Sequence, residues 1–520
     1  MRSRSRNAMR AAVAAIALSV VAACGGGTGG GGPDSSGGEP VRGGTMAYAV
    51  NSDAQSLDAA KCGQNLNWGP CQALYGTLLN YDLESNEFTP GMAESFTSED
   101  GTTWTLTLRA GVTFSDGTPF DAAAVVFNWD RAKDPVSASP GGSVARAMTY
   151  AVTDPRTVTV TLPQPNWQLP WAMYSELAFI GSPQAITQKG RDFANAPVGA
   201  GPFTLESWTR GTSIDFVRNA NYWDQPRPYL DRFRIMIIGP DEQRANALRS
   251  GQIDGMASLV TKDAERLSGE GYSQAVLNHV GGTGVRVQMQ RGPLADPDVR
   301  TAVAKLVDAQ QISDAFYGGV PGVTTFAMEG SLLYDPAARY PTPDVAGAQA
   351  LIDGYLARTG QSEVRLTYSL VGGIPVQDGV AQMVQAQVQR AKGIRIDIKA
   401  LDAAAYLTEL NAGNYDLGLA SINGVNPDVL YLQFHTGSSQ NTGRYSDPAT
   451  DAALDRARAT KDVDGQIAAY KEATRHIAAN SGQISWRYQV TYVLSREGVH
   501  GVQPNLSVYV RSDQLWVEPS

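Results

Sequence analysis

Alternating apolar and hydroxylated positions mark the first strands that the chain predicts. Between Thr103 and Leu108, tryptophan or leucine occupies every second position and threonine fills the positions between them. Successive side chains of a strand point to opposite faces, so this pattern predicts an antiparallel strand with one apolar face. The stretch from Thr157 to Leu162 repeats the pattern and predicts a second strand.

A helix is predicted between these two strands. A turn of sequence Asp-Gly-Thr-Pro precedes Asp121, whose carboxylate can cap the start of a helix, and Val125, Val126 and Trp129 then share one face. We expect that apolar face to pack in the core.

The second half of the chain follows a different pattern. Val364–Leu370 reads as a strand, residues 376–392 as a helix that Gly393 ends, and Ile394–Leu401 as a further alternating strand. This order predicts a βαβ unit. A β-rich part, over roughly residues 45–280, is therefore joined to an α/β part, over roughly 283–484, and ligands commonly bind in the cleft between two such lobes.

Composition agrees with a folded chain of two or three lobes. The 520 residues are 42% hydrophobic and 18% charged, which excludes wholesale disorder, a small disulfide scaffold and a polytopic membrane protein. The formal net charge is -9. Because nucleic-acid binding requires clustered Lys and Arg, and no basic stripe with interleaved aromatic residues occurs, we expect no nucleic-acid partner.

The amino terminus has the pattern of an export signal. Residues 1–23 combine an Arg-rich start with an apolar run that is too short to span a membrane, which predicts a signal peptide. The run ends in Val-Ala-Ala followed by Cys24, which resembles the bacterial lipobox, where the cysteine receives a lipid. Residues 24–44 are rich in Gly, Ser and Pro and predict a flexible tether. The alternative is an ordinary signal peptide with an incidental cysteine.

The remaining cysteines, Cys62 and Cys71, are nine residues apart in a chain that we expect to be exported, and we predict a disulfide between them. A metal site is the weaker alternative. None of the four histidines has ligand spacing to a cysteine or to another histidine. They are His279, His435, His476 and His500.

No catalytic motif accompanies this organisation. The chain lacks H-E-x-x-H, G-x-S-x-G, a P-loop and an EF-hand loop, and its paired carboxylates lie at predicted turns. We therefore predict no enzyme activity and no cofactor. An exported, tethered, acidic protein with two lobes is best explained as a receptor that captures a solute beside its own membrane.

Several sequence blocks carry a family resemblance. The segment MAESFTSEDGTTWTLTLRAGVTFSDGTPF, from Met92 to Phe120, continues to Arg131 and resembles the hallmark of solute-binding protein family 5. These proteins are the extracytoplasmic receptors of dipeptide, oligopeptide and nickel ABC importers. The other blocks follow in the family's order and are Val198–Phe203 with Arg218–Trp223, Pro228–Asp231 with Leu248–Asp254, Asp298–Val303, and Tyr445–Asp451.

The resemblance implies an α/β, two-lobed fold of the periplasmic-binding-protein (Venus flytrap) type, with an inserted subdomain in lobe I and two crossover strands as hinge. The expected boundaries are 45–75 with 200–282 and 485–520 for lobe I, 76–199 for the inserted subdomain, and 283–484 for lobe II. The implied mechanism is lobe closure on a peptide or other small-molecule solute. The implied partners are ABC permease subunits with cytoplasmic ATPases, and we expect a monomer, lipid-anchored on the extracytoplasmic face of the cell membrane.

One loop departs from the peptide-binding members of the family. Those members carry Trp-x-x-Asp where this chain has Ile422 and Val425, and the missing carboxylate is the one that pairs with the peptide's α-ammonium. A buried ammonium without its counter-charge loses several kcal/mol. We therefore expect a solute that needs no free α-ammonium, such as a modified peptide, an oligosaccharide or a siderophore-like molecule. Asn423, Asn426 and Asp428 are candidate ligand contacts, with a turn as the alternative role.

Three further groups are candidate ligand contacts by position. Asn51, Ser52 and Asp53 end the first strand of lobe I, Trp68 and Tyr75 flank the expected disulfide, and Arg286 and Arg291 bracket the crossover into lobe II. The respective alternatives are a solvated turn, core packing and surface ion pairs.

Nickel is the least favoured solute, because only one histidine, His435, is expected beside the cleft. Two other classes of protein remain as alternatives. One is a secreted cell-wall hydrolase, against which the missing nucleophile and metal motifs count, and the other is a signalling receptor that senses its solute without importing it.

Overall fold

The computed structural model describes residues 38–63, 66–506 and 508–519. The expected signal peptide and Cys24 lie outside these residues. Glu39–Ser520 forms one compact unit. Within the described ranges, no helix is both long enough and apolar enough to cross a bilayer.

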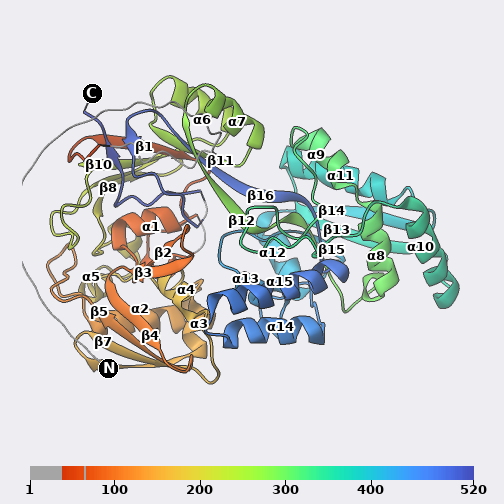
Figure 1. The fold of residues 1–520 in the computed structure, drawn as a ribbon, viewed down its shortest axis with the longest axis horizontal. Coiled ribbons are helices and arrows are strands. Elements are labelled where there is room, and N and C mark those ends of the chain that lie inside the picture. The colour runs from red at the N-terminus through yellow and green to blue at the C-terminus, as the bar shows by residue number, and fades with distance from the viewer. Residues whose placement is uncertain (1–37, 64–65, 507, 520) are drawn as a thin grey trace, which may run out of the picture. The chain divides into compact units, whose positions relative to one another are not determined.

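A ten-stranded sheet runs through the whole unit (Figure 1). Its strands are β1 (Thr45–Val50), β8 (Phe203–Thr209), β9 (Ser213–Arg218), β10 (Arg232–Ile237), β11 (Gly255–Ser258), β12 (Ser273–Val287), β13 (Val364–Val371), β14 (Ile394–Leu401), β15 (Leu417–Ser421) and β16 (Gln483–Ser495). Their order is β14-β13-β15-β12-β16-β11-β1-β10-β9-β8. The strands of lobe II therefore lie at one end of the sheet and those of lobe I at the other.

The two long strands β12 and β16 join these ends. They pair antiparallel with each other, and β12 also pairs with β15 of lobe II while β16 pairs with β11 of lobe I. Figure 1 shows them crossing side by side between the two groups of elements. Their register is interrupted between Asn278 and Gly282. A break in the ladder at the crossover is where such a sheet can bend.

The rest of lobe I packs around β1, which is parallel to both β10 and β11. Its other elements are α1 (Trp68–Tyr75), α6 (Asp241–Arg249), α7 (Thr261–Gly269), the short strands β17 (Val499–His500) and β18 (Trp516–Val517), and the 3-10 turn η1 (Ala59–Lys61).

The region expected as the inserted subdomain contains a four-stranded sheet and a two-stranded sheet, and it has its own apolar core. Its elements are β2 (Leu79–Asp82), β3 (Glu87–Pro90), β4 (Ala93–Ser98), β5 (Thr103–Leu108), β6 (Thr149–Asp154), β7 (Thr157–Thr161), α2 (Ala122–Lys133), α3 (Gly142–Ala147), α4 (Leu169–Tyr174), α5 (Pro183–Lys189), η2 (Pro135–Ser137) and η3 (Gly190–Asn195). The two predicted strands are confirmed as β5 and β7, which pair antiparallel. The predicted helix is confirmed as α2, where the Asp121 carboxylate accepts a hydrogen bond from Ala124 N at 2.9 Å.

Lobe II contains the predicted βαβ unit, with β13 and β14 parallel and adjacent. Its helices are α8 (Pro297–Leu306), α9 (Ala309–Phe316), α10 (Val345–Thr359), α11 (Pro375–Val388), α12 (Ala403–Ala412), α13 (Val429–Phe434), α14 (Pro448–Ala459) and α15 (Val463–Ala479), with η4 (Pro293–Ala295). Helix α11 ends four residues before the predicted position. Residues 390 and 391 instead form tighter turns with i−3 hydrogen bonds that lead to Gly393, whose φ is 75°.

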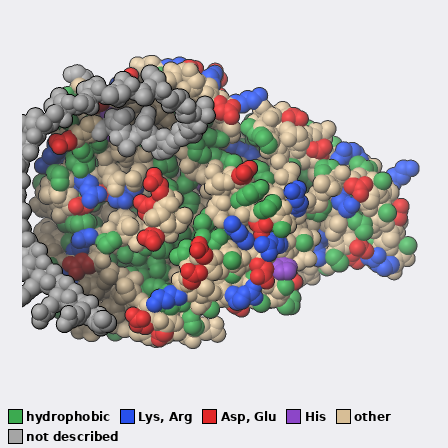
Figure 2. Space-filling view, in the orientation of Figure 1, with side chains coloured by type: hydrophobic (Ala, Val, Ile, Leu, Met, Phe, Trp, Pro, Cys, Tyr) green, Lys and Arg blue, Asp and Glu red, His purple; other side chains and the backbone are tan. Residues whose placement is uncertain are grey.

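On the face drawn in Figure 2, acidic and basic side chains are interspersed over both groups of elements.

Candidate ligand-binding cleft

A cavity of about 420 Å³ opens between the inserted subdomain and lobe II. One wall comes from α3, α4 and the residues around them, and the other from the loop after β15, from α13 and from Arg458 of α14. The residues that line it are Pro140, Ser143, Val144, Asn166, Gln168, Leu169, Trp171, Ala172 and Glu176 from the first side, and Ser421, Asn423, Asn426, Asp428, Val429, Leu432, Gln433, Gln440 and Arg458 from the second. The three predicted contacts Asn423, Asn426 and Asp428 thus share one wall.

The Asp428 carboxylate is fully occupied by its neighbours. Arg458 donates to both of its oxygens, at 2.8 and 2.7 Å, and the Tyr470 hydroxyl donates to Oδ1 at 2.8 Å. The Arg458 guanidinium also stacks on the ring of Tyr431, with its central carbon 3.2 Å from the ring centroid. Asp428 and Arg458 therefore form a compensated ion pair in the cavity wall.

The loop before Asp428 is tied to the crossover strands by His279 of β12. Its Nδ1 accepts a hydrogen bond from Gly424 N at 2.6 Å, and its Nε2 lies 2.9 Å from the hydroxyl of Thr491 in β16. Val280 N donates to Gly424 O at 3.0 Å. Burial lowers the pKa of His279 to about 4, so at neutral pH the ring is uncharged and Nδ1 is free to accept.

The two positions that depart from the peptide-binding pattern are both apolar and buried. Ile422 packs in a core of lobe II, whereas Val425, with 8% of its surface exposed, packs in the main apolar cluster of lobe I. Asn423 is exposed to the cavity, and Asn426 Oδ1 accepts a hydrogen bond from Asp428 N at 2.8 Å. The position at which the peptide-binding members carry the aspartate is thus a buried hydrocarbon side chain that does not belong to the lining of the cavity.

A second acidic residue, Glu176, lines the opposite wall and was not anticipated from the sequence. It follows α4, and the Ser175 hydroxyl donates to its Oε2. Burial raises the pKa of the Glu176 carboxyl, and the negative charge of Asp428 adds to the increase. Glu176 is about 250 positions from Asp428 in the chain and belongs to no motif, so no sequence signal pointed to it.

Among the predicted contacts at the end of β1, Asp53 holds a neighbouring hairpin. Asp53 accepts hydrogen bonds from Trp208 Nε1 at 3.0 Å and from Gly211 N at 2.9 Å, so its carboxylate holds the hairpin between β8 and β9. Asn51 and Ser52 are half-buried, and Asn51 Oδ1 is buried without a partner among the described residues. These residues do not belong to the lining of the cavity.

Trp68 and Tyr75 lie in the core of lobe I. Trp68 is 1% exposed and makes edge contacts with Tyr174 and Phe179, with ring centroids 5.8 and 6.1 Å apart. The Tyr75 hydroxyl donates to Leu57 O at 2.6 Å. Of the two roles considered for these side chains, core packing is the one observed in this arrangement.

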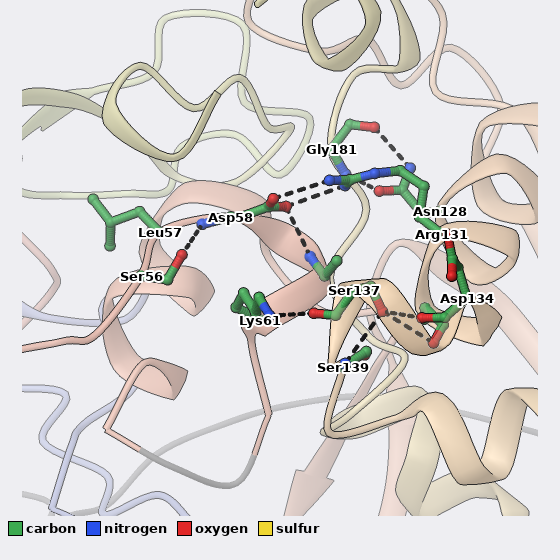
Figure 3. A network of polar contacts seen from close by, with 12 residues as sticks. Ser56, Leu57, Asp58, Lys61, Asn128, Arg131, Asp134, Ser137, Ser139 and Gly181 are labelled. Carbon is green, nitrogen blue, oxygen red and sulfur yellow. Dashed lines mark hydrogen bonds and ion pairs between the residues drawn. The ribbon is translucent and has the colours of Figure 1, made fainter. Parts of the chain in front are cut away.

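The segment that carries the disulfide is fastened to α2 (Figure 3). Cys62 and Cys71 are bonded, with their Cα atoms 6.1 Å apart. Four residues before Cys62, Asp58 accepts two hydrogen bonds from Arg131 of α2, at 3.1 and 2.9 Å, and also caps η1 by accepting from Ala60 N. Lys61 donates to Ser137 O in the same network. These contacts join lobe I to the subdomain that forms one wall of the cavity.

The two candidate arginines differ in their surroundings. Arg286 is 3% exposed and donates to the side chains of Gln433, at 2.5 Å, and Gln483, at 3.0 Å. Burial lowers the pKa of its guanidinium. It supports the cavity through Gln433, which lines the wall. Arg291 is exposed and donates to Gly413 O and Asn414 Oδ1, both at 3.0 Å.

Among the described residues, no group of three or more His, Cys, Asp or Glu side chains is arranged to hold a metal ion. His435 stacks on Tyr431 and lies 3.2 Å from a carboxylate oxygen of Asp455.

An aromatic cavity of about 300 Å³ adjoins the first and shares Gln168 and Trp171 with it. Its lining also includes Tyr81, Phe88, Trp104 and Trp167 from the subdomain and Leu332, Pro427, Lys461, Val463, Gln466 and Ile467 from lobe II. Both lobes therefore contribute to each cavity.

Comparisons with known proteins agree on one family. A family model described as bacterial extracellular solute-binding proteins, family 5 Middle, matches residues 87–444. The glutathione-binding protein GsiB of Salmonella paratyphi A is 26% identical over 449 residues, which cover 82% of this chain and 86% of that protein.

Solved structures show the same fold at low identity. DppA from Helicobacter pylori, in complex with the peptide STSA, is 22% identical with a TM-score of 0.77 over 92% of this chain and 99% of that one. AgaA from A. tumefaciens, in complex with agropinic acid, is 23% identical with the same TM-score and coverage. The oligopeptide-binding protein AppA from Bacillus subtilis, in complex with a nonapeptide, is 18% identical with a TM-score of 0.75 over 92% and 100%.

Proposed function

The chain belongs to the bacterial extracellular solute-binding proteins of family 5, and from this membership we propose that it captures a peptide or peptide-like solute between its lobes and delivers it to the permease of an ABC importer. Binding and release are its whole activity, without catalysis and without a cofactor.

The observation that carries this proposal is a cavity lined by polar and apolar side chains of both lobes, beside the crossover of β12 and β16. Such a cavity is completed when the lobes close and is opened when they separate, which is how a hinged receptor takes up and releases its solute. The interrupted register between Asn278 and Gly282 gives the crossover a point of bending. The similar protein GsiB is described as glutathione-binding, and the structurally similar DppA is described in complex with a peptide.

We further propose that recognition does not depend on an α-ammonium bound at the loop after β15. Val425 offers no charge there. The two carboxylates considered as substitutes, Asp53 and Asp428, already have hydrogen-bonding partners. An ammonium placed against Val425 would lose its hydration without receiving a counter-charge.

The test is mass spectrometry of solutes that co-purify under native conditions, followed by calorimetric titration of those solutes and of matched peptides with free and acetylated amino termini. We expect acetylation to change affinity less than about threefold, a difference below 1 kcal/mol. Tight binding of free peptides that disappears on acetylation would contradict the proposal about the α-ammonium. If no solute co-purifies and no peptide binds, the proposal that the solute is a peptide or peptide-like molecule is contradicted.

For the cell, we propose lipid attachment at Cys24 and a tether over residues 24–44 that holds a monomeric receptor at the extracytoplasmic face of the membrane. The test is incorporation of labelled lipid into the wild type and into Cys24→Ala. Equal incorporation in both would contradict the anchor.

A further inference from the structure

The cavity of about 420 Å³ between the subdomain and lobe II has more acidic than basic side chains in its lining. Its ionisable lining residues are Glu176, Asp428 and Arg458. Asp428 and Arg458 neutralise each other through two hydrogen bonds of 2.8 and 2.7 Å. Glu176 is left over, so the described lining carries one negative charge in excess when this carboxyl is ionised.

Glu176 has no cationic partner within ion-pair distance among the described residues. Its side chain accepts a hydrogen bond from the Ser175 hydroxyl, a neutral donor. Burial and the nearby Asp428 both raise the pKa of Glu176, which means that the ionised form is disfavoured in the empty cavity. The ionised form of such a carboxylate is stabilised most when a positive charge comes close to it.

A second polar side chain of the same wall, Gln168, has an amide donor without a hydrogen-bond acceptor among the described residues. Gln168 is only 4% exposed, lines the cavity, and its Nε2 is buried without a hydrogen-bond partner in the part of the chain that the structure describes. A buried amide donor without a partner costs free energy that a bound acceptor would restore. Gln168 and Trp171 line both this cavity and the aromatic one.

We propose that Glu176 is a specificity-determining residue that pairs with a positively charged ammonium or guanidinium group of the solute, while Gln168 donates to a carbonyl oxygen beside that group. This inference rests on the proposed function, since it names a chemical feature of the solute that the receptor captures. The counter-charge lies on the subdomain wall, opposite the loop that contains Val425. A cationic solute would thus be recognised from a different side of the cleft than a peptide α-ammonium bound at that loop.

The cation can come from a basic side chain or from an amino terminus, and three tripeptide probes separate the two sources. N-acetyl-Ala-Lys-Ala carries only the side-chain ammonium, Ala-Ala-Ala carries only the α-ammonium, and N-acetyl-Ala-Lys(acetyl)-Ala carries neither. Calorimetric titration of each is made with the wild type and with Glu176→Gln, Glu176→Asp and Glu265→Gln. Glu265 is exposed on α7, away from the cavity, so its variant removes an equal charge from the protein.

Because acetylation of the amino terminus is expected to change affinity less than about threefold, Ala-Ala-Ala should bind no more tightly than the uncharged probe. We expect the wild type and Glu265→Gln to bind N-acetyl-Ala-Lys-Ala about tenfold or more tightly than the uncharged probe. Glu176→Gln should abolish that preference, and Glu176→Asp should retain part of it. The charged probe that loses affinity identifies the source of the cation.

Equal affinity for charged and uncharged probes in the wild type would overturn the inference while leaving the peptide receptor intact. A charge preference that survives in Glu176→Gln would overturn it too, because another group would then hold the cation. Binding of none of the probes would contradict the peptide class and remove the inference with it.

Thermal unfolding of the solute-free protein supplies a measurement that needs no ligand. Removal of a half-buried carboxyl that has no cationic partner should leave the Tm of Glu176→Gln equal to the wild-type value or raise it by about 1 to 3 °C, whereas Glu265→Gln should be unchanged. A Tm well below that of Glu265→Gln would show that Glu176 has a structural role, and would overturn the inference.

Discussion

His279 is a buried, uncharged histidine whose two ring nitrogens join the cleft loop to the crossover. Nδ1 accepts from Gly424 N and Nε2 contacts Thr491, so one side chain connects the loop to β12 and β16. Protonation of Nδ1 would replace an acceptor by a donor and place it against the Gly424 N–H. The loop should therefore remain in position only while the ring is neutral.

This arrangement predicts a particular dependence of stability on pH. Burial lowers the pKa of His279 from 6.5 to about 4. The contribution of the neutral ring to the free energy of unfolding is therefore complete above about pH 6.5 and is lost as the pH falls through about 4. Between neutral pH and about pH 4.5, the wild type should lose roughly 2 to 3 kcal/mol more free energy of unfolding than His279→Asn, which keeps an acceptor without a titratable ring. Urea denaturation at the two pH values measures the difference. Identical pH dependence in both proteins would contradict it.

At the scale of elements, α2 connects two other segments of the structure, one in the subdomain and one in lobe I. Asp121 caps its start, Asn128 exchanges two hydrogen bonds with the backbone of Gly181, and Arg131 holds Asp58 of lobe I. The helix therefore fixes the position of the subdomain relative to the segment that carries the disulfide.

We expect Asp121→Ala to lower the free energy of unfolding by about 1 kcal/mol, because the first turn of α2 loses its side-chain acceptor. Asp121→Ser, which restores an acceptor, should recover most of that loss. Urea denaturation of the three proteins is the measurement. A serine variant as unstable as the alanine variant would show that Asp121 acts through something other than the cap.

The elements also show what residue patterns could and could not predict. Strands β5, β7, β13 and β14 and helix α2 were predicted because the periodicity of their side chains follows directly from one apolar face. The loop with Asn423, Asn426 and Asp428 was found through a family resemblance, and these three residues do line one cavity. Their roles toward a ligand stay predictions.

The opposite wall was not predicted, for a physical reason. Glu176 and Gln168 of the subdomain come to face the loop of lobe II only through tertiary packing, and no local spacing records that arrangement. The hydrogen bonds of Asp53 and Asp428 could not be predicted from the sequence either, because their partners Trp208 and Arg458 are distant in the chain. The sequence pattern shows which residues are polar, but it does not show which of them lack a hydrogen-bonding partner in the fold.

At the scale of the whole molecule, the crossover is held by two kinds of hydrogen bond. On either side of the register break, β12 and β16 pair with each other. At the break itself, Val280 N donates to the cleft loop at Gly424 O, and Ile422 N donates to Gly282 O. The loop therefore replaces the missing part of the ladder.

We expect the amides of Val280, Ile422 and Gly424 to exchange with solvent at least about tenfold faster than those of residues 284–287 and 490–494, because loop contacts open more readily than paired strands. Hydrogen–deuterium exchange followed by NMR measures both sets. His279→Ala should speed exchange at Gly424 further and leave the strand amides unchanged. Uniform exchange along β12 and β16 would contradict a hinge at the break.

The central place of β16 in the sheet also has a consequence for the order in which the molecule can be made. This strand lies between β11 of lobe I and β12, yet residues 483–495 are among the last to be synthesised. Until they emerge, both neighbours keep an open edge and neither lobe can complete its sheet, although most of the chain is already present. Pairing over such long sequence separations is slow. A nascent chain of this topology stays incompletely folded until nearly its last residue, which suits a protein that must be threaded through a membrane before it folds.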